Sequence, residues 1–328
     1  MGSEMCIRDS YSVMAKVGER LRIGAVEHDN FHFRGLRWTT VCPSRGPFEI
    51  HIDGDEYIQC LEKMTIPSGS NTQPLDPADT TCFRSVVGSF GWAAGELRPD
   101  IAFEASLLTQ KYQTPTIYDA KRANAVIDYV KKHRVVLRIR PGARSLTVYH
   151  DGSLANLEDS GSQGGRLYCL TDSTGHWVSS FPHWESRKIK RVCHSSATAE
   201  VLSSVDAQDG SEWISQMWFE MTGTRLLVRL VTDNDSLIKK ITTTKLPVEK
   251  RVRVDLAGLR EGLRRGEFVM TWVASRSELA DALTKTNPHT IQISFSDKRP
   301  LLAALATNCT HLATIPSVTK TRGDVCNF

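Results

Sequence analysis

The length, composition and charge of the chain exclude several classes of protein. At 328 residues it is long enough for about two domains, and its apolar share of 40% is ordinary for a globular protein. No apolar run approaches the roughly 20 residues that a membrane helix needs, and no secretory signal pattern opens the chain, so no membrane partner is expected. The formal net charge of +4, from 41 basic and 37 acidic residues, permits a nucleic-acid partner without requiring one.

The first half of the chain predicts a small α+β segment followed by helices. The opening residues 1–10 are similar to a translated sequencing adapter, so we treat them as foreign and expect the natural protein to extend further upstream. Phe48–Ile52 alternates with period two, as a strand does, and Glu56–Leu61 predicts a short helix. Residues 66–80 are rich in turn-forming residues and predict a loop. Three helices are expected next: Asp79–Gly95, Asp100–Lys111 and Ile117–His133.

Pro141-Gly142 marks the expected boundary to a second domain. The predicted divisions are a segment of residues 11–140, a domain of residues 141–286 and an unassigned tail of residues 287–328. From residue 145 the predicted order is strand, strand, strand, helix, strand, helix, helix, strand, helix. The three opening strands are expected at Ser145–His150, Arg166–Asp172 and His176–Phe181, with a hairpin turn at Ser173-Thr-Gly175.

The remaining elements predict an α/β fold. A long helix from Ser196 toward Gly223 carries an apolar repeat, and Leu226–Thr232 is apolar on both faces, as a central parallel strand would be. The repeat consists of Leu202, Val205, Trp213, Met217 and Met221. Phe268–Ala274 is the fifth strand, and Ser275-Arg-Ser-Glu278 is a capping-box pattern that starts the last helix. A mixed sheet with helices on both faces follows from this order.

The eight cysteines are scattered along the chain, and none forms a Cys-x-x-Cys pair. Their spacing argues against a zinc site and against a disulfide framework. A reducing compartment inside the cell, either cytoplasm or nucleus, is therefore expected.

Four acidic residues are predicted to form the functional site: Asp151, Glu200, Asp233 and Asp281. Asp151 and Asp233 each follow a β-like run. Glu200 lies early in the long helix, and Asp281 lies in the last helix. Carboxylates at strand ends and helix starts can converge in space, and such a cluster suits two hard divalent cations, which prefer oxygen ligands. Asp151 is the expected bridge between the two ions, and Gly152 would let backbone and substrate approach closely.

Each of these acids also has an ordinary structural interpretation. Asp151 and Asp233 could be turn residues at strand ends, and Glu200 and Asp281 could be helix charges that the dipole favours. Because all four occur together in this order of elements, the metal site is the favoured interpretation.

Five blocks of the second half occur in a fixed order that matches a known family. They are His150-Asp-Gly-Ser-Leu-Ala-Asn156, Trp184-Glu-Ser-Arg-Lys188, Ser195-Ser-Ala-Thr-Ala-Glu200, Thr232-Asp-Asn-Asp-Ser-Leu-Ile238 and Glu278-Leu-Ala-Asp-Ala-Leu-Thr-Lys285. They resemble the ribonuclease H domain of copia-type retrotransposon polyproteins. Upstream, Phe83-Arg-Ser-Val-Val-Gly-Ser89 and Leu97-Arg-Pro-Asp-Ile101 resemble the segment after the polymerase palm of these reverse transcriptases.

The resemblance implies a ribonuclease H fold with a mixed five-stranded sheet, preceded by the end of a reverse transcriptase. It implies cleavage of the RNA strand of RNA–DNA hybrids, with Asp151, Glu200, Asp233 and Asp281 as catalytic acids. It also implies two magnesium ions, for which manganese often substitutes in oxygen-rich sites. The remainder of the polyprotein is an expected partner, and no small-molecule cofactor is expected.

The chain also departs from the family. No Tyr-x-Asp-Asp pattern occurs, so no polymerase site is expected here, and Asp53 and Asp55 better fit a turn. Lys250-Arg251 stands where the family often has Lys-His, and Val201 replaces an aromatic residue after the second acid. A catalytically inactive, nucleic-acid-binding remnant of a polyprotein is therefore the alternative. A third interpretation, an unrelated nuclease of the same fold, leaves the helices of residues 79–134 unexplained.

Several residues near the acids are candidates for contacts to a hybrid. Asn156 and Asn234 could reach 2′-hydroxyl groups, which distinguish RNA from DNA, or could be turn residues. A basic stretch could follow a phosphate backbone or be a solvated surface; its residues are Arg187, Lys188, Lys190 and Arg191. Trp184 is expected in the core.

Histidine and cysteine chemistry is not favoured. His176, His183 and His194 are weak candidates for proton shuttles, because a metal site already activates water. Cys193-His194 has no evident orienting residue, and Ser195 is instead expected to cap the long helix.

Overall fold

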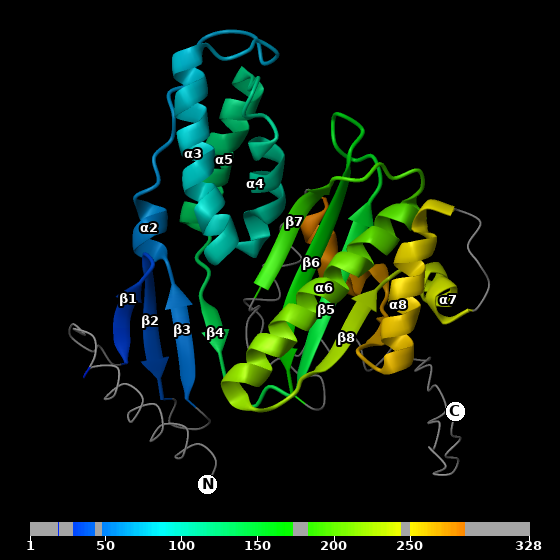
Figure 1. Ribbon diagram of the computed structural model, residues 1–328. Coiled ribbons are helices and arrows are strands. Elements are labelled where there is room, and N and C mark those ends of the chain that lie inside the picture. Colours follow the sequence, from blue (N-terminus) through cyan, green and yellow to red (C-terminus); the bar gives the residue numbers. More distant parts are fainter. Residues whose placement is uncertain (1–18, 20–28, 43–47, 173–182, 244–249, 286–328) are drawn as a thin grey trace, which may run out of the picture.

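The computed structural model contains two β-sheets, each with its own helices (Figure 1). It describes residues 19, 29–42, 48–172, 183–243 and 250–285. The opening ten residues and the tail after residue 286 lie outside the described residues.

The smaller sheet is antiparallel throughout, with the order β1-β2-β3-β4. Its strands are β1 (Asn30–Phe33), β2 (Leu36–Val41), β3 (Glu49–Asp53) and β4 (Leu137–Ile139). The predicted strand at Phe48–Ile52 is confirmed as β3, shifted by one residue. β4 was not predicted, because three residues are too few to show an alternating pattern.

The helices of the first segment follow the predicted order. They are α2 (Asp55–Gln59), α3 (Pro77–Glu96), α4 (Ala102–Thr109) and α5 (Ile117–Lys132). Asp76 caps α3 by accepting from the Asp79 N–H, and Thr116 forms a capping box with Asp119. A short 3₁₀ helix, η1 (Pro99–Ile101), separates α3 from α4, because proline is tolerated at the start of a helix but not inside it.

The larger sheet has five strands in the order β7-β6-β5-β8-β9. They are β5 (Ser145–Ser153), β6 (Ser162–Thr171), β7 (His183–Ile189), β8 (Leu227–Thr232) and β9 (Val269–Trp272). β6 is antiparallel to both of its neighbours, whereas β5, β8 and β9 are parallel to one another. The predicted α/β architecture with a mixed five-stranded sheet is therefore confirmed.

Two details of the strand prediction differ from the structure. The central strand is β5, and β8 lies beside it, so the prediction that Leu226–Thr232 is central was wrong. The predicted third strand, His176–Phe181, and its turn lie outside the described residues. The strand on the other side of β6 from β5 is β7. It was not predicted as a strand, because this edge strand is mostly polar and has no alternating apolar pattern.

α6 (Ser196–Thr222) crosses one face of the larger sheet together with α8 (Arg253–Arg265), and α7 (Asp235–Thr242) packs into the same cluster (Figure 1). A 3₁₀ turn, η2 (Lys250–Val252), precedes α8. α6 has 27 residues, yet no described helix, α6 included, is both long and apolar enough to cross a membrane.

The face that α6 turns to the sheet is built from small residues at every fourth position. These residues are Ala199, Ser203, Ala207 and Ser211, and all are buried. The predicted apolar repeat is correct for Leu202 but wrong for Trp213 and Met221, which are 62% and 63% exposed. Small side chains allow the helix to approach the sheet closely, and Val201 and Ile214 of α6 are buried beside this row.

The described chain ends in two short 3₁₀ helices, η3 (Ser275–Ser277) and η4 (Leu279–Leu283). The predicted last helix is confirmed as η4, although it is a 3₁₀ helix and the capping box at Ser275–Glu278 was wrong. The Glu278 carboxylate caps η4 by accepting from the Ala280 N–H. Four of the five residues of η4 are buried, so packing holds it in place together with this cap.

The second face of the larger sheet is covered by η4 and by the first segment. One buried cluster joins Leu36 and Leu97 of that segment to Leu167 and Leu283. Trp184 belongs to the same cluster, as predicted, and its indole N–H donates to the carbonyl of Ala94 at 2.6 Å. The domain boundary at Pro141-Gly142 stays a prediction: it lies between β4 and β5, and this core extends across it.

Candidate active site

Asp151 and Asp233 are neighbours because of the register between two parallel strands. β5 and β8 pair Tyr149 with Val231. Two residues further along lie Asp151, in β5, and Asp233, just after β8. The two carboxylates therefore start from matching positions on adjacent strands.

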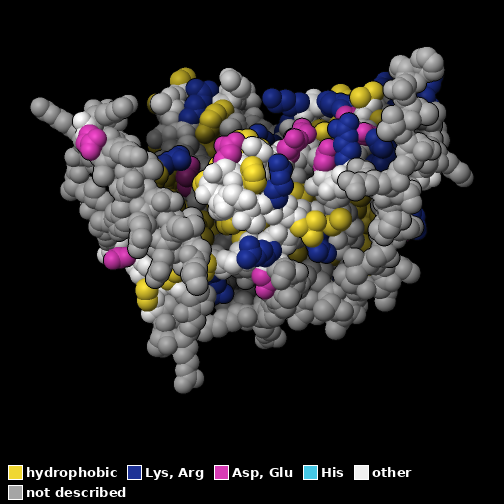
Figure 2. Space-filling model, turned by 60° about the horizontal axis from the view of Figure 1, so that its bottom comes forward, with side chains coloured by type: hydrophobic (Ala, Val, Ile, Leu, Met, Phe, Trp, Pro, Cys, Tyr) yellow, Lys and Arg dark blue, Asp and Glu magenta, His cyan; other side chains and the backbone are white. Residues whose placement is uncertain are grey.

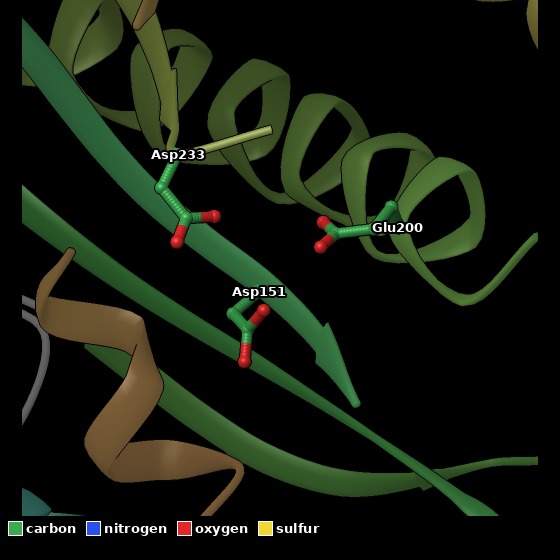
Figure 3. Close-up of side chains that lie close together, drawn as sticks. All are labelled: Asp151, Glu200 and Asp233. Carbon is green, nitrogen blue, oxygen red and sulfur yellow. The ribbon is translucent and has the colours of Figure 1, made fainter. Parts of the chain in front are cut away.

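Glu200 reaches the same place from the first turns of α6. Ser195 caps this helix by accepting from the Thr198 N–H at 3.2 Å, which confirms its predicted role. Ligand oxygens of Asp151, Glu200 and Asp233 all lie within 4.8 Å of one another. Figure 3 shows the three side chains directed toward a shared space between the two strands and the helix. The structure thus brings together three of the four predicted acids.

The close approach of α6 to β5 depends on Gly152. A Cβ atom at this position would lie 2.4 Å from the carbonyl carbon and oxygen of Ala199 and 2.8 Å from the backbone nitrogen of Glu200. The hydroxyl of Ser203 donates to the carbonyl of Asp151 at 2.8 Å and fixes the same contact. The glycine predicted to allow close approach does so for the helix that carries Glu200.

We expect Gly152→Ala to displace the start of α6 and to destabilise the fold by about 1–3 kcal/mol, since the atoms in the way are backbone atoms. Gly258→Ala in α8 is the matched control, because a Cβ there meets nothing within 4 Å. This control should gain about 0.5–1 kcal/mol from helix propensity. Urea unfolding of both variants measures the difference, and equal stabilities would contradict the close-packing account.

Asp281 lies outside the group of three. Its carboxylate forms an ion pair with the ammonium of Lys285 at 2.7 Å. The same ammonium lies 4.0 Å from Oδ2 of Asp151. Lys285 therefore connects Asp281 to the cluster, and the role of Asp281 as a metal ligand stays a prediction.

Burial is the largest cause of unusual protonation in the cluster. It raises the pKa of Glu200 to about 8; repulsion from Asp151 and Asp233 acts in the same direction, and a hydrogen bond from Asn234 opposes it. Burial also raises the pKa of Asp151 to about 6, against a hydrogen bond from Thr284 and the charge of Lys285. The cluster thus carries more negative charge than its surroundings stabilise.

A hard divalent cation fits this set of donors. All three side chains offer carboxylate oxygens, which such cations prefer. Within the described part of the chain, Oε2 of Glu200 is buried and has no hydrogen-bond partner. Buried polar atoms are nearly always paired, so an oxygen of this kind is a natural ligand for an ion.

Glu278 is a fifth carboxyl group that the sequence did not assign to the site. It is fully buried, and its pKa lies well above its usual range, first because of burial and then because of repulsion from Asp151, Asp233 and Asp281. In the sequence it looked like a capping residue, and no pattern distinguished it from one. Thr284 and Lys285 end the last of the five blocks that resemble the family, and no sequence pattern marks either of them as part of the site.

Asn156 and Asn234 both make structural contacts beside the acids. The Asn156 amide donates to the carbonyl of Thr284 at 2.7 Å. Asn234 caps α7, where its Oδ1 accepts from the Leu237 N–H at 3.0 Å. Contacts of these residues to a hybrid stay predictions.

The four basic residues predicted to bind phosphates lie in β7 or directly after it. Three of them form ion pairs: Arg187 with Glu185, Lys188 with Asp159, and Arg191 with Asp255. Figure 2 shows basic and acidic side chains interspersed over the face that it displays. Exposed ion pairs are worth only about 0–1 kcal/mol, so these side chains could exchange their partners for phosphates.

The same four residues line a cavity of about 550 Å³ between β7 and α6. Trp213, exposed on α6, also lines it, whereas Asp151, Glu200 and Asp233 do not. The basic stretch and the acid cluster are therefore separate features. α6 connects them, since it carries Glu200 near its start and Trp213 further along.

The remaining candidates show no catalytic arrangement. His183 packs against Tyr168 with tilted rings, whose centroids are 5.3 Å apart, and it lines the cavity rather than the acid cluster. His194 is exposed, and His176 lies outside the described residues. The Cys193 thiol lies 3.7 Å from the carbonyl of Arg191, a contact that does not activate a nucleophile.

Comparison with known proteins finds similarity to transposon proteins. No family model matches it. It is 26% identical over 303 residues to a retrovirus-related Pol polyprotein from transposon RE1 of Arabidopsis thaliana, a match that covers 84% of this chain and 19% of the relative. It is 32% identical over 142 residues to a transposon Ty5-1 protein of Saccharomyces cerevisiae, covering 40% of this chain and 43% of that protein. The solved structure of LC11-RNase H1 in complex with an RNA/DNA hybrid covers 42% of this chain and 93% of that chain, at 15% identity and a TM-score of 0.33.

The homologues of this chain are retrovirus-related polyproteins and proteins of transposons. The predicted resemblance to retrotransposon polyproteins is confirmed, and the copia type stays a prediction. The chain spans about a fifth of the Arabidopsis polyprotein.

Proposed function

We propose that this chain is the ribonuclease H-type nuclease part of a retrotransposon polyprotein and cleaves the RNA strand of RNA–DNA hybrids inside the cell. The observation that carries this proposal is the convergence of Asp151, Glu200 and Asp233 within 4.8 Å. Homology to transposon Pol polyproteins supports it, because reverse transcription produces RNA–DNA hybrids.

The side chains of the cluster have distinct proposed roles. When bound, two magnesium ions, or manganese in their place, would activate the attacking water and offset the charge on the leaving oxygen. Asp151, Glu200 and Asp233 would hold these ions through their carboxylate oxygens. Asp281 would complete the set of ligands by exchanging its ion pair with Lys285. Glu200, whose pKa is about 8, would release its proton as a cation binds.

Substrate contacts complete the proposal. Asn156 and Asn234 would contact 2′-hydroxyl groups, and Arg187, Lys188, Lys190 and Arg191 would contact phosphates. Asn156 donates to the carbonyl of Thr284, and Asn234 hydrogen-bonds to Glu200, so both asparagines lie beside the acid cluster. The four basic residues line one cavity. These positions support the assignment.

Incubation of the full chain with a labelled RNA–DNA hybrid tests the proposal. We expect cleavage of the RNA strand with magnesium or manganese, no cleavage after chelation, and no cleavage of DNA–DNA or RNA–RNA duplexes of the same sequence. Salt-sensitive binding without turnover would favour the alternative, an inactive nucleic-acid-binding remnant. This alternative is supported by the ion pairs of Arg187, Arg191 and Asp281, because these side chains already have partners within the protein.

A further inference from the structure

The segment Leu283–Thr284 lies unusually close to the strand beside Asp151. Gly165 of β6 pairs directly with Asp151 of β5. A Cβ atom on Gly165 would lie 2.7 Å from Cβ of Leu283 and 2.9 Å from both the carbonyl of Ala280 and Cγ2 of Thr284. The glycine therefore leaves the space in which the end of η4 reaches the acid cluster.

Thr284 uses this position to contact Asp151 directly. Its side chain is fully buried, and its hydroxyl donates to Oδ2 of Asp151. The other acceptor within reach of this hydroxyl is the carbonyl of Asp281, at 3.2 Å. Since the carboxylate acceptor carries charge, the hydrogen bond to Asp151 is the stronger of the two.

Two further hydrogen bonds hold the segment in place. The Asn156 amide donates to the carbonyl of Thr284 at 2.7 Å, and the Ser186 hydroxyl donates to the carbonyl of Leu283 at 2.5 Å. Asn156 follows β5 and Ser186 lies in β7, so the segment is attached to both sides of the sheet region around Gly165. The hydroxyl of Thr284 is thus a fixed donor rather than a freely rotating one.

We propose that Thr284 is a positioning residue that holds the carboxylate of Asp151 in the orientation needed to bind a divalent cation. The consequence of this for catalysis rests on the proposed function. Groups that hydrogen-bond to metal ligands typically change metal affinity about 10- to 100-fold when removed. Thr284 is such a group for Asp151, because its hydroxyl donates to the carboxylate. Asn156 acts indirectly, because its amide donates to the carbonyl of Thr284.

The test measures binding of Mn²⁺ to the full chain without any nucleic acid, by electron paramagnetic resonance. We expect Thr284→Val, which removes only the hydroxyl, to weaken Mn²⁺ binding about 10- to 100-fold. Thr284→Ser should bind nearly as the wild type does. Thr171→Val is the matched control: this threonine is also buried and hydrogen-bonded, to Ser145, away from the acids, and the variant should bind Mn²⁺ normally.

Asn156→Ala keeps the proposal testable if Thr284→Val does not fold, since Asn156 is exposed, and we expect several-fold weaker Mn²⁺ binding. Wild-type affinity in every folded variant of Thr284 and Asn156 overturns the inference, and so does a wild-type chain that binds no Mn²⁺. A chain whose Mn²⁺ binding depends on Thr284 but which cleaves no hybrid would overturn the proposed function while leaving this inference intact.

Discussion

We expect Asp151→Asn and Asp233→Asn each to reduce hybrid cleavage by about 10³-fold or more, with both variants staying folded. The reason is that the two carboxylates lie at matching positions of β5 and β8 and supply two of the three converging ligands. Charge stabilisation by bound cations is worth several kcal/mol in a reaction of this kind, and each ~1.4 kcal/mol is a factor of ten in rate. Single-turnover cleavage of a labelled hybrid at saturating enzyme measures the loss.

Asp235→Asn is the control for this experiment. It lies two residues after Asp233 and is exposed, and its partner is Lys239 in the next turn of α7. The same change of charge there should leave the rate within about twofold, because an exposed helical ion pair is worth only about 0.5 kcal/mol. Unchanged cleavage in either cluster variant would contradict the assignment of this site as the catalytic centre.

The strands that carry the site were readable from the sequence, but their register was not. The runs ending at His150 and Thr232 are apolar enough to predict buried strands, and both are confirmed as β5 and β8. Nothing local in either run fixes that Tyr149 pairs with Val231. That pairing follows from the packing of α6 and from the hydrogen bonds between the strands, which involve residues far apart in the chain.

The failures of prediction share a physical cause. Trp213 and Met221 looked like core residues because the pattern weights large apolar side chains, whereas α6 turns a row of Ala and Ser to the sheet. Local patterns could not show this, because the contacts of a residue depend on how closely two elements approach, and glycines such as Gly152 and Gly165 set that distance. The role of Asp281 stays a prediction, and its carboxylate pairs with Lys285 four residues further along.

Stability without divalent cations should fall as the pH rises from about 6.5 to about 8. The pKa of Glu200 is raised from 4.5 to about 8 in the folded state. A raised pKa means that the folded state binds the proton more tightly, so the stabilisation is complete below the unfolded pKa and is lost as the pH rises through about 8. Over this window Glu200 contributes a loss of roughly 1–2 kcal/mol. Guanidinium unfolding in the presence of a chelator measures it.

The lower limit of this window is set by a different residue. Burial lowers the pKa of His150 to about 3, so His150 contributes stability that is present above its unfolded pKa near 6.5 and is lost as the pH falls. Below about 6.5 the effects of His150 and Glu200 therefore oppose each other. Above that value the folded and unfolded states both hold His150 mostly neutral, and the trend reports on the acid cluster.

Glu200→Gln should remove the part of this pH dependence that Glu200 contributes and make the cation-free protein more stable at pH 8, on the order of a few kcal/mol. The buried Glu278, whose pKa is also raised, acts in the same direction and keeps its own part in this variant. Glu212→Gln is the matched control, because Glu212 is an exposed acid of the same helix. A saturating cation should restore the wild type at pH 8 by about 2.7 kcal/mol at 100 times its dissociation constant, with much less effect on Glu200→Gln. A cation-free wild type of constant stability across the window would show that Glu200 is not held protonated by burial. In that case the repulsion between these carboxylates could not be what draws a cation to the cluster.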